Sequence, residues 1–96
     1  MSERVVIFTR LTAQPGRRAE LLAVLEALGH ETRAEPGNEV FVVHMARDEP
    51  DVVLGYEVFR DEQAVTDHRV TDAVRRARER LPELLAEDPT ITYARG

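Results

Sequence analysis

The chain has 96 residues, enough for one domain but too few for two domains that each need a core. Cysteine is absent, which excludes disulfides, thiolate metal sites and a cysteine nucleophile. The net charge is −5, and the 13 basic residues, all arginines, are scattered among acids, which argues against nucleic-acid binding. The sequence shows neither a signal peptide nor an apolar run of about 20 residues, so we expect a cytoplasmic protein.

Periodic apolar residues divide the chain into strands and helices. Residues 4–12 alternate, whereas residues 17–34 repeat leucines at helical spacing. Asp61 suits the N-cap of a short helix, and Pro82 is expected to interrupt the following one, after which Leu84 and Leu85 pack a last turn. In chain order we predict strand 4–12, helix 17–34, strands 39–47 and 52–60, helices 62–69 and 71–81, and strand 90–94.

This β, α, β, β, α, β order predicts a single α+β domain over residues 1–96. The expected fold is ferredoxin-like βαββαβ, with an antiparallel sheet and the helices on one face. No internal repeat, linker or low-complexity segment interrupts it.

The predicted strands are apolar on both faces, although the helices of this fold cover only one. In the second strand, one set of alternating residues is as apolar as the other. The two sets are Val40, Val42 and His44 on one side, and Phe41, Val43 and Met45 on the other. An apolar sheet face left in water is an association surface. We therefore expect a homodimer in which this face meets its own copy.

Several short motifs occur in an order and spacing typical of one known family. They are Arg10-Leu11 with Pro15-Gly16, Glu35-Pro36-Gly37, Tyr56-Glu57-Val58-Phe59, and a D-x-x-A-x-x-x-H pattern formed by Asp61, Ala64 and His68. With these motifs, nearly the whole chain resembles the antibiotic biosynthesis monooxygenase family.

The resemblance implies a dimeric α+β barrel with face-to-face sheets and an apolar pocket between sheet and helices in each subunit. It further implies a cofactor-independent oxidoreductase that uses molecular oxygen, with neither metal nor flavin, on a small aromatic, quinol or polyketide-type substrate. Haem degradation is disfavoured, because the three positions that a haem-degrading branch uses hold Thr9, His68 and Arg78.

His68 and Tyr56 are the predicted catalytic residues. A histidine ordinarily titrates near pH 6.5 or so, which suits a base that removes a proton from a phenol or an activated carbon. The alternative is that His68 only caps a helix or binds a backbone carbonyl. Tyr56 is expected either to donate a hydrogen bond to a substrate oxygen or to pack in the core.

Five further residues are predicted to bind substrate: Thr9, His44, Glu57, Phe59 and Arg78. His44 lies among apolar residues, where a hydrogen-bonded core role is the alternative. Glu57 is an acid in an apolar strand, so it requires a partner. Arg10 is the natural partner, whereas a second reading has Glu57 raise the basicity of a histidine. The scattered histidines make no metal motif.

Three functions fit these residues. The first is a cofactor-independent monooxygenase, and the second is an isomerase or cyclase that uses the same acid–base pocket. The third is a non-catalytic dimeric small-molecule-binding module. The third reading is favoured by two departures from the family pattern, Phe41 in place of a tyrosine and Ala73 in place of a second histidine.

Overall fold

A computed structural model describes residues 3–96, so residues 1 and 2 of the predicted 1–96 domain lie outside the described residues. One antiparallel sheet has the strand order β2-β3-β1-β4. The elements are β1 (Val5–Thr12), α1 (Arg18–Thr32), β2 (Asn38–Met45), β3 (Val52–Phe59), α2 (Glu62–Arg69), α3 (Asp72–Leu84) and β4 (Thr90–Arg95). This confirms the predicted ferredoxin-like α+β fold.

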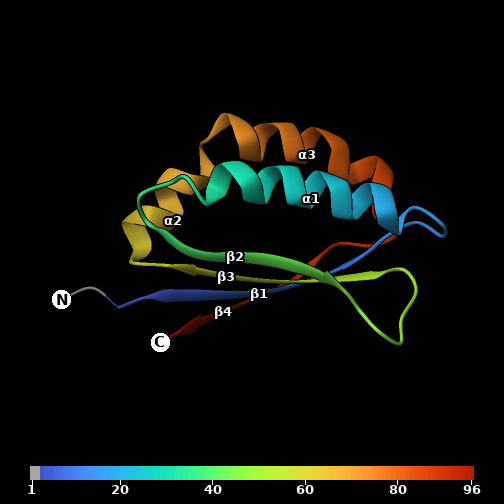
Figure 1. Cartoon of the computed structure of the whole chain (residues 1–96), viewed down its shortest axis with the longest axis horizontal. Coiled ribbons are helices and arrows are strands. Elements are labelled where there is room, and N and C mark those ends of the chain that lie inside the picture. The colour runs from blue at the N-terminus through green and yellow to red at the C-terminus, as the bar shows by residue number, and fades with distance from the viewer. Residues whose placement is uncertain (1–2) are drawn as a thin grey trace.

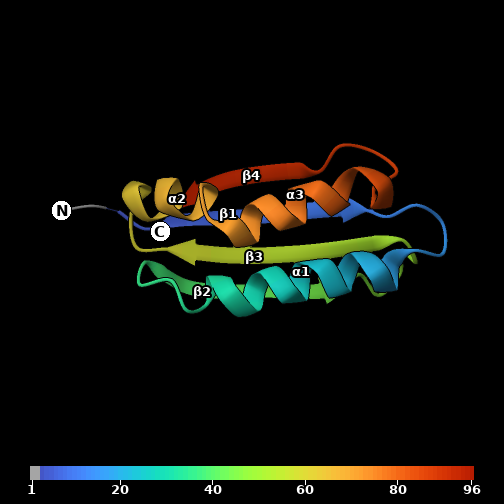
Figure 2. The same ribbon diagram turned by 90° about the horizontal axis from the view of Figure 1, so that it is seen from above.

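The helices form a single layer on one side of the sheet, and the opposite side carries none (Figure 1). Seen from above, α1 and α3 run side by side along the strands, and α2 lies near the start of β1 (Figure 2). Much of β4, at the edge of the sheet, is left uncovered by α3 (Figure 2). Ile91 and Tyr93 of β4 accordingly remain 51% and 52% exposed.

Strand alternation determines which residues face the helices. Val5, Ile7 and Leu11 of β1 are buried on that face, as predicted. The buried apolar residues of the strands and helices form two clusters. The larger, between α1 and the sheet, contains Leu11, Ala13, Leu21, Leu25, Phe41, Val43, Val53 and Leu84. The smaller, under α2, contains Val5, Ile7, Phe59, Ala64 and Val65.

The open face of the sheet is apolar and exposed. Phe8 is 49% exposed and Leu54 is 41% exposed. Phe8 packs on Tyr56 across the strands with ring centroids 5.2 Å apart. These residues belong to the face that the sequence identified as an association surface.

The prediction that Pro82 interrupts the last helix was wrong, whereas Leu84 packs in a last turn as predicted. The helix α3 continues through Pro82 to Leu84, and the Leu85 N–H donates to the Leu81 carbonyl at 3.0 Å. Leu84 is fully buried in the larger core cluster. Packing of Leu84 holds the last turn in helical conformation despite the hydrogen bond that proline cannot donate.

Candidate functional site

A buried histidine lies between two carboxylates at the α2 end of the sheet. His68, on α2, is only 9% exposed. Its Nδ1 lies 3.1 Å from a carboxylate oxygen of Glu35, in the turn after α1, and its Nε2 lies 4.0 Å from Oε1 of Glu57 on β3. The His68 ring packs on Phe59 with centroids 5.0 Å apart. The ring is therefore held on three sides.

The local sequence explains why His68 takes this position. The Asp61 side chain caps α2 by accepting a hydrogen bond from the Ala64 N–H at 2.8 Å. At the other end, the Thr71 hydroxyl donates to the His68 carbonyl at 2.9 Å. Both ends of this short helix are thus tied to their neighbours, and His68 lies on its buried side with Ala64 and Val65.

Hydrogen-bond chemistry constrains the proton positions. An ionised carboxylate only accepts, so Nδ1 must carry the hydrogen that points at Glu35. In the neutral ring this leaves a lone pair on Nε2, directed toward Glu57. Burial raises the pKa of Glu57 above its ordinary value; the nearby His68 opposes this rise and Glu35 adds to it. Nε2 of His68 and the Glu57 carboxyl group therefore lie 4.0 Å apart, with the Nε2 lone pair free to accept a proton.

A pocket of about 130 Å³ opens beside this pair. It lies between β1, β3 and β4 on one side and α2 and α3 on the other. Thr9 lines it, and the absence of a side chain at Gly55 leaves room for the Thr9 hydroxyl, which a Cβ there would overlap. Its lining residues are Ile7, Thr9, Glu57, Val65, His68, Arg69, Val74, Arg78, Ile91 and Tyr93.

Among the predicted site residues, the structure brings Thr9, Glu57, His68 and Arg78 to one pocket. Phe59 supports the His68 ring from the core. Tyr56 lies on the open face, where it packs on Phe8, so within one chain it does not share a site with His68.

The prediction that Glu57 pairs with Arg10 was wrong. The two residues point to opposite faces of the sheet, and Arg10 forms an ion pair with Glu49 instead. Likewise His44, expected among apolar neighbours, is exposed on the open face opposite Leu54. Neither residue reaches the pocket.

Two residues of the site were missed by sequence reasoning. Glu35 lies 33 positions before His68 and was recognised only as part of the Glu35-Pro36-Gly37 motif. Tyr93 lies on the exposed edge strand β4, where its hydroxyl accepts a hydrogen bond from Arg69 at 2.7 Å. Sequence spacing carried no signal for either contact, because both depend on how separate elements meet.

A metal centre is not formed by these side chains. Glu35 and Glu57 approach opposite nitrogens of the His68 ring, so the three do not converge on one point. Across residues 3–96 no group of three or more histidines and acids could hold a metal ion. Within the same residues, no helix is long and apolar enough to cross a membrane.

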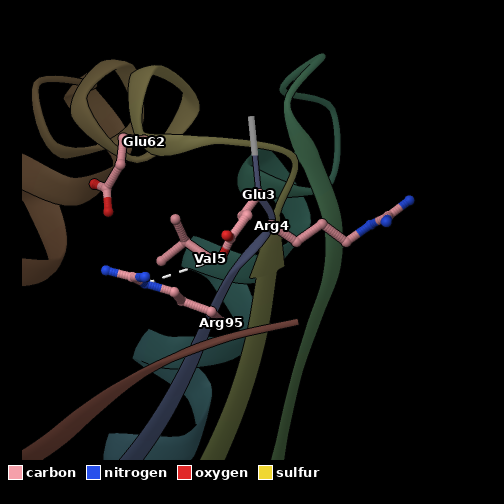
Figure 3. Close-up of a pocket in the computed structure, with 5 residues that line it drawn as sticks. All are labelled: Glu3, Arg4, Val5, Glu62 and Arg95. Atoms are coloured by element: carbon pink, nitrogen blue, oxygen red, sulfur yellow. Dashed lines mark ion pairs between the residues drawn. The ribbon is translucent and has the colours of Figure 1, made fainter. Parts of the chain in front are cut away.

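A second hollow, of about 300 Å³, lies at the end of the sheet near residue 3 (Figure 3). Arg95 pairs with Glu3 at 3.9 Å across it, whereas Arg4 points away and pairs with Glu39 at 2.5 Å. The charges on its walls are exposed and compensated. It lacks a buried acid–base group like His68, so the smaller pocket is the candidate site.

Comparisons with known proteins agree with this fold. The family model described as antibiotic biosynthesis monooxygenase matches residues 4–80. The Mycobacterium tuberculosis protein named "Putative monooxygenase Rv0793" is 29% identical over 92 residues, or 96% of this chain and 90% of that protein.

Solved structures of other proteins have the same fold as this chain. The crystal structure of SO0527 from Shewanella oneidensis has a TM-score of 0.92 and 27% identity, and the match covers 100% of this chain and 93% of that one. PA3566 from Pseudomonas aeruginosa has the same TM-score and identity, with 100% and 96% covered.

Proposed function

Because this chain belongs to the antibiotic biosynthesis monooxygenase family, we propose that it is a cofactor-independent monooxygenase that oxidises a small aromatic or quinol-type molecule with molecular oxygen. The observation that carries the proposal is His68, oriented by Glu35 and opening toward Glu57 in a pocket. Such a histidine is suited to remove a proton from a substrate bound there.

The proposed reaction converts a ring C–H beside a phenol hydroxyl into a carbonyl. His68 Nε2 takes the phenol proton, and the resulting phenolate gives one electron to oxygen. The radical and superoxide combine into a peroxide on the neighbouring ring carbon, which is protonated by the imidazolium. The hydrogen on that carbon then leaves as a proton while the O–O bond breaks, so one oxygen atom stays on the carbon and the other departs as water. The substrate anion itself reduces oxygen, so this chemistry requires neither metal nor flavin.

Two carboxylates, those of Glu35 and Glu57, have defined parts in this proposal. Glu35 fixes the ring through Nδ1, which keeps Nε2 directed at the pocket. Glu57 stabilises the imidazolium once it forms, because its carboxylate lies 4.0 Å away. Tyr56, on the far face of the sheet, takes no part within one chain.

The proposal is tested by oxygen uptake with a panel of single-ring phenols and quinols. His68→Ala should lower uptake by roughly 10²–10⁴-fold, the usual contribution of a positioned general base. His30→Ala is the matched control, since this histidine is exposed on α1, outside the pocket and the open face, and should leave the rate unchanged. If no compound supports uptake, or if His68→Ala keeps the full rate, the proposal fails.

A second candidate follows from the proximity of His68 and Glu57, two groups that can each carry a proton. A pair that takes a proton from one carbon and returns it to another catalyses isomerisation or cyclisation without oxygen. Product mass separates the two: the monooxygenase product contains one new oxygen atom, and the isomerase product contains none. Ligand binding with no turnover would indicate a non-catalytic binding module.

We further propose that the protein works as a homodimer joined through the open sheet face. Support comes from the exposed apolar residues Phe8, Leu54 and Tyr56, which form one surface across β1 and β3. A second copy is the simplest cover, because the same surface is then buried on both subunits.

A further inference from the structure

Two arginines of the pocket differ from the others in their partners. Nine arginines form ion pairs with carboxylates: Arg4, Arg10, Arg17, Arg47, Arg60, Arg75, Arg76, Arg80 and Arg95. Arg18 and Arg33 donate to main-chain carbonyls instead. Within residues 3–96, only Arg69 and Arg78 have neither kind of partner, and both line the pocket beside His68.

The position of Arg69 is fixed by a neutral group. Its Nη2 donates to the Tyr93 hydroxyl at 2.7 Å, and its guanidinium carbon lies 5.6 Å from the centre of the Tyr93 ring. Both contacts orient the guanidinium without neutralising its charge. The donors of Arg69 that Tyr93 does not occupy therefore remain available to an anion at the pocket.

Arg78 lies on α3 and lines the pocket beside His68. It also lines a neighbouring hollow of about 470 Å³ formed by the end of α3 and the segment 85–89. Because one residue lines both hollows, its charge acts on a negatively charged group bound in the pocket or beside it.

The remaining walls limit the size and chemistry of the ligand. They are apolar, with Ile7, Val65, Val74 and Ile91 around the acid–base pair. The volume of about 130 Å³ is below the roughly 300 Å³ at which sites for drug-sized ligands begin. The space thus suits one flat ring with a charged substituent.

We propose that the substrate is a single-ring aromatic acid whose carboxylate binds Arg69 and Arg78 while its ring lies beside His68. This substrate class rests on the proposed function of the same pocket. The planar guanidinium fork matches a carboxylate with two parallel hydrogen bonds.

Calorimetric titration with two matched ligands tests the proposal. Hydroquinone is neutral, and 2,5-dihydroxybenzoate is the same ring with an added carboxylate. We expect the acid to bind at least about tenfold more tightly, as charge-assisted hydrogen bonds provide. Arg69→Gln and Arg78→Gln should each remove most of this preference. Arg75→Gln, on the same helix but paired with Asp72 and Glu79, should leave it unchanged.

Equal binding of the two ligands, binding of neither, or a preference that survives in the Arg69→Gln/Arg78→Gln double variant would overturn the inference. Oxygen uptake measured in parallel keeps it separate from the proposed function. Arginine-dependent binding of the acid without uptake leaves the inference standing and removes the monooxygenase. Uptake with hydroquinone, combined with equal binding of the two ligands, would support the monooxygenase and overturn the inference about the aromatic acid.

Discussion

Glu57 is the residue whose ionisation opposes folding. Burial raises its pKa in the folded chain, and the attraction of His68 does not compensate in full. The folded state therefore binds more protons than the unfolded state between the ordinary pKa of a glutamate and the raised one. Stability must fall as pH rises through that interval, and it stays at the lower level above it.

Because the ionisation of Glu57 lowers the stability of the folded state, we predict that Glu57→Gln stabilises the protein at neutral pH. The amide keeps the shape of the side chain but has no charge to bury. The gain should shrink as pH falls toward about 4, where the wild-type carboxyl is protonated in both states. Urea unfolding from pH 4 to 8 measures it. Glu26→Gln, at an exposed position on α1, is the control and should show no such trend.

The sequence alone predicted His68 as a site residue, but it did not predict which side chains surround His68 in the fold. Alternation along β3 already placed Glu57 opposite to Tyr56, and alternation along β1 placed Arg10 opposite to Thr9. A stricter use of those faces would have rejected the Arg10–Glu57 pair. Glu35 was beyond such reasoning, because its contact depends on how the turn after α1 meets α2.

At the scale of the elements, the contact between Glu35 and His68 depends on how closely α2 approaches the start of β2. Gly37 is buried against Ala64, and a Cβ at Gly37 would overlap the Ala64 Cβ and lie 3.3 Å from its backbone Cα. The backbone of a capped helix cannot yield as a flexible side chain would. Gly37 thus sets the distance between the turn that carries Glu35 and the helix that carries His68.

We expect Gly37→Ala to destabilise the fold by about 1–3 kcal/mol, as overpacking does. The smaller gain from restricting the unfolded chain, about 0.4–1 kcal/mol, does not offset this. Thermal unfolding would show the loss. Ala64→Gly in the same chain restores the space at a helix-propensity cost of about 1 kcal/mol. The double variant should therefore lose less than the sum of the single losses, and strict additivity would contradict the proposed contact.

Element order and strand faces were predictable because they depend on local alternation and spacing. The end of α3 was not, since a proline in the sequence argues for a break whatever follows it. Leu84 was expected to pack a last turn, but the continuity of this turn with the rest of α3 depended on the assembled sheet and helices. The end of a helix near a proline therefore depends on tertiary packing, which predictions from local sequence do not include.

For the whole molecule, the two faces of the sheet have different tasks. The helix side holds the core and the pocket, while the open side presents Phe8, Leu54 and Tyr56 to its surroundings. The reason to expect association through the open face is independent of catalysis, because an exposed apolar surface favours association whatever the pocket does. The dimer proposal can therefore succeed or fail without affecting the chemistry proposed for His68.

Light scattering after size exclusion should give twice the chain mass of 10.9 kDa at micromolar concentration. Leu54→Asp should shift this to the monomer, because association would bury an unpaired carboxylate on each subunit. The fold should tolerate the change, since Leu54 is 41% exposed in the single chain. Ala23→Asp, on the exposed side of α1, adds the same charge away from the sheet and should leave the dimer intact. A wild-type protein of 10.9 kDa under these conditions would show that the open face does not pair with its own copy.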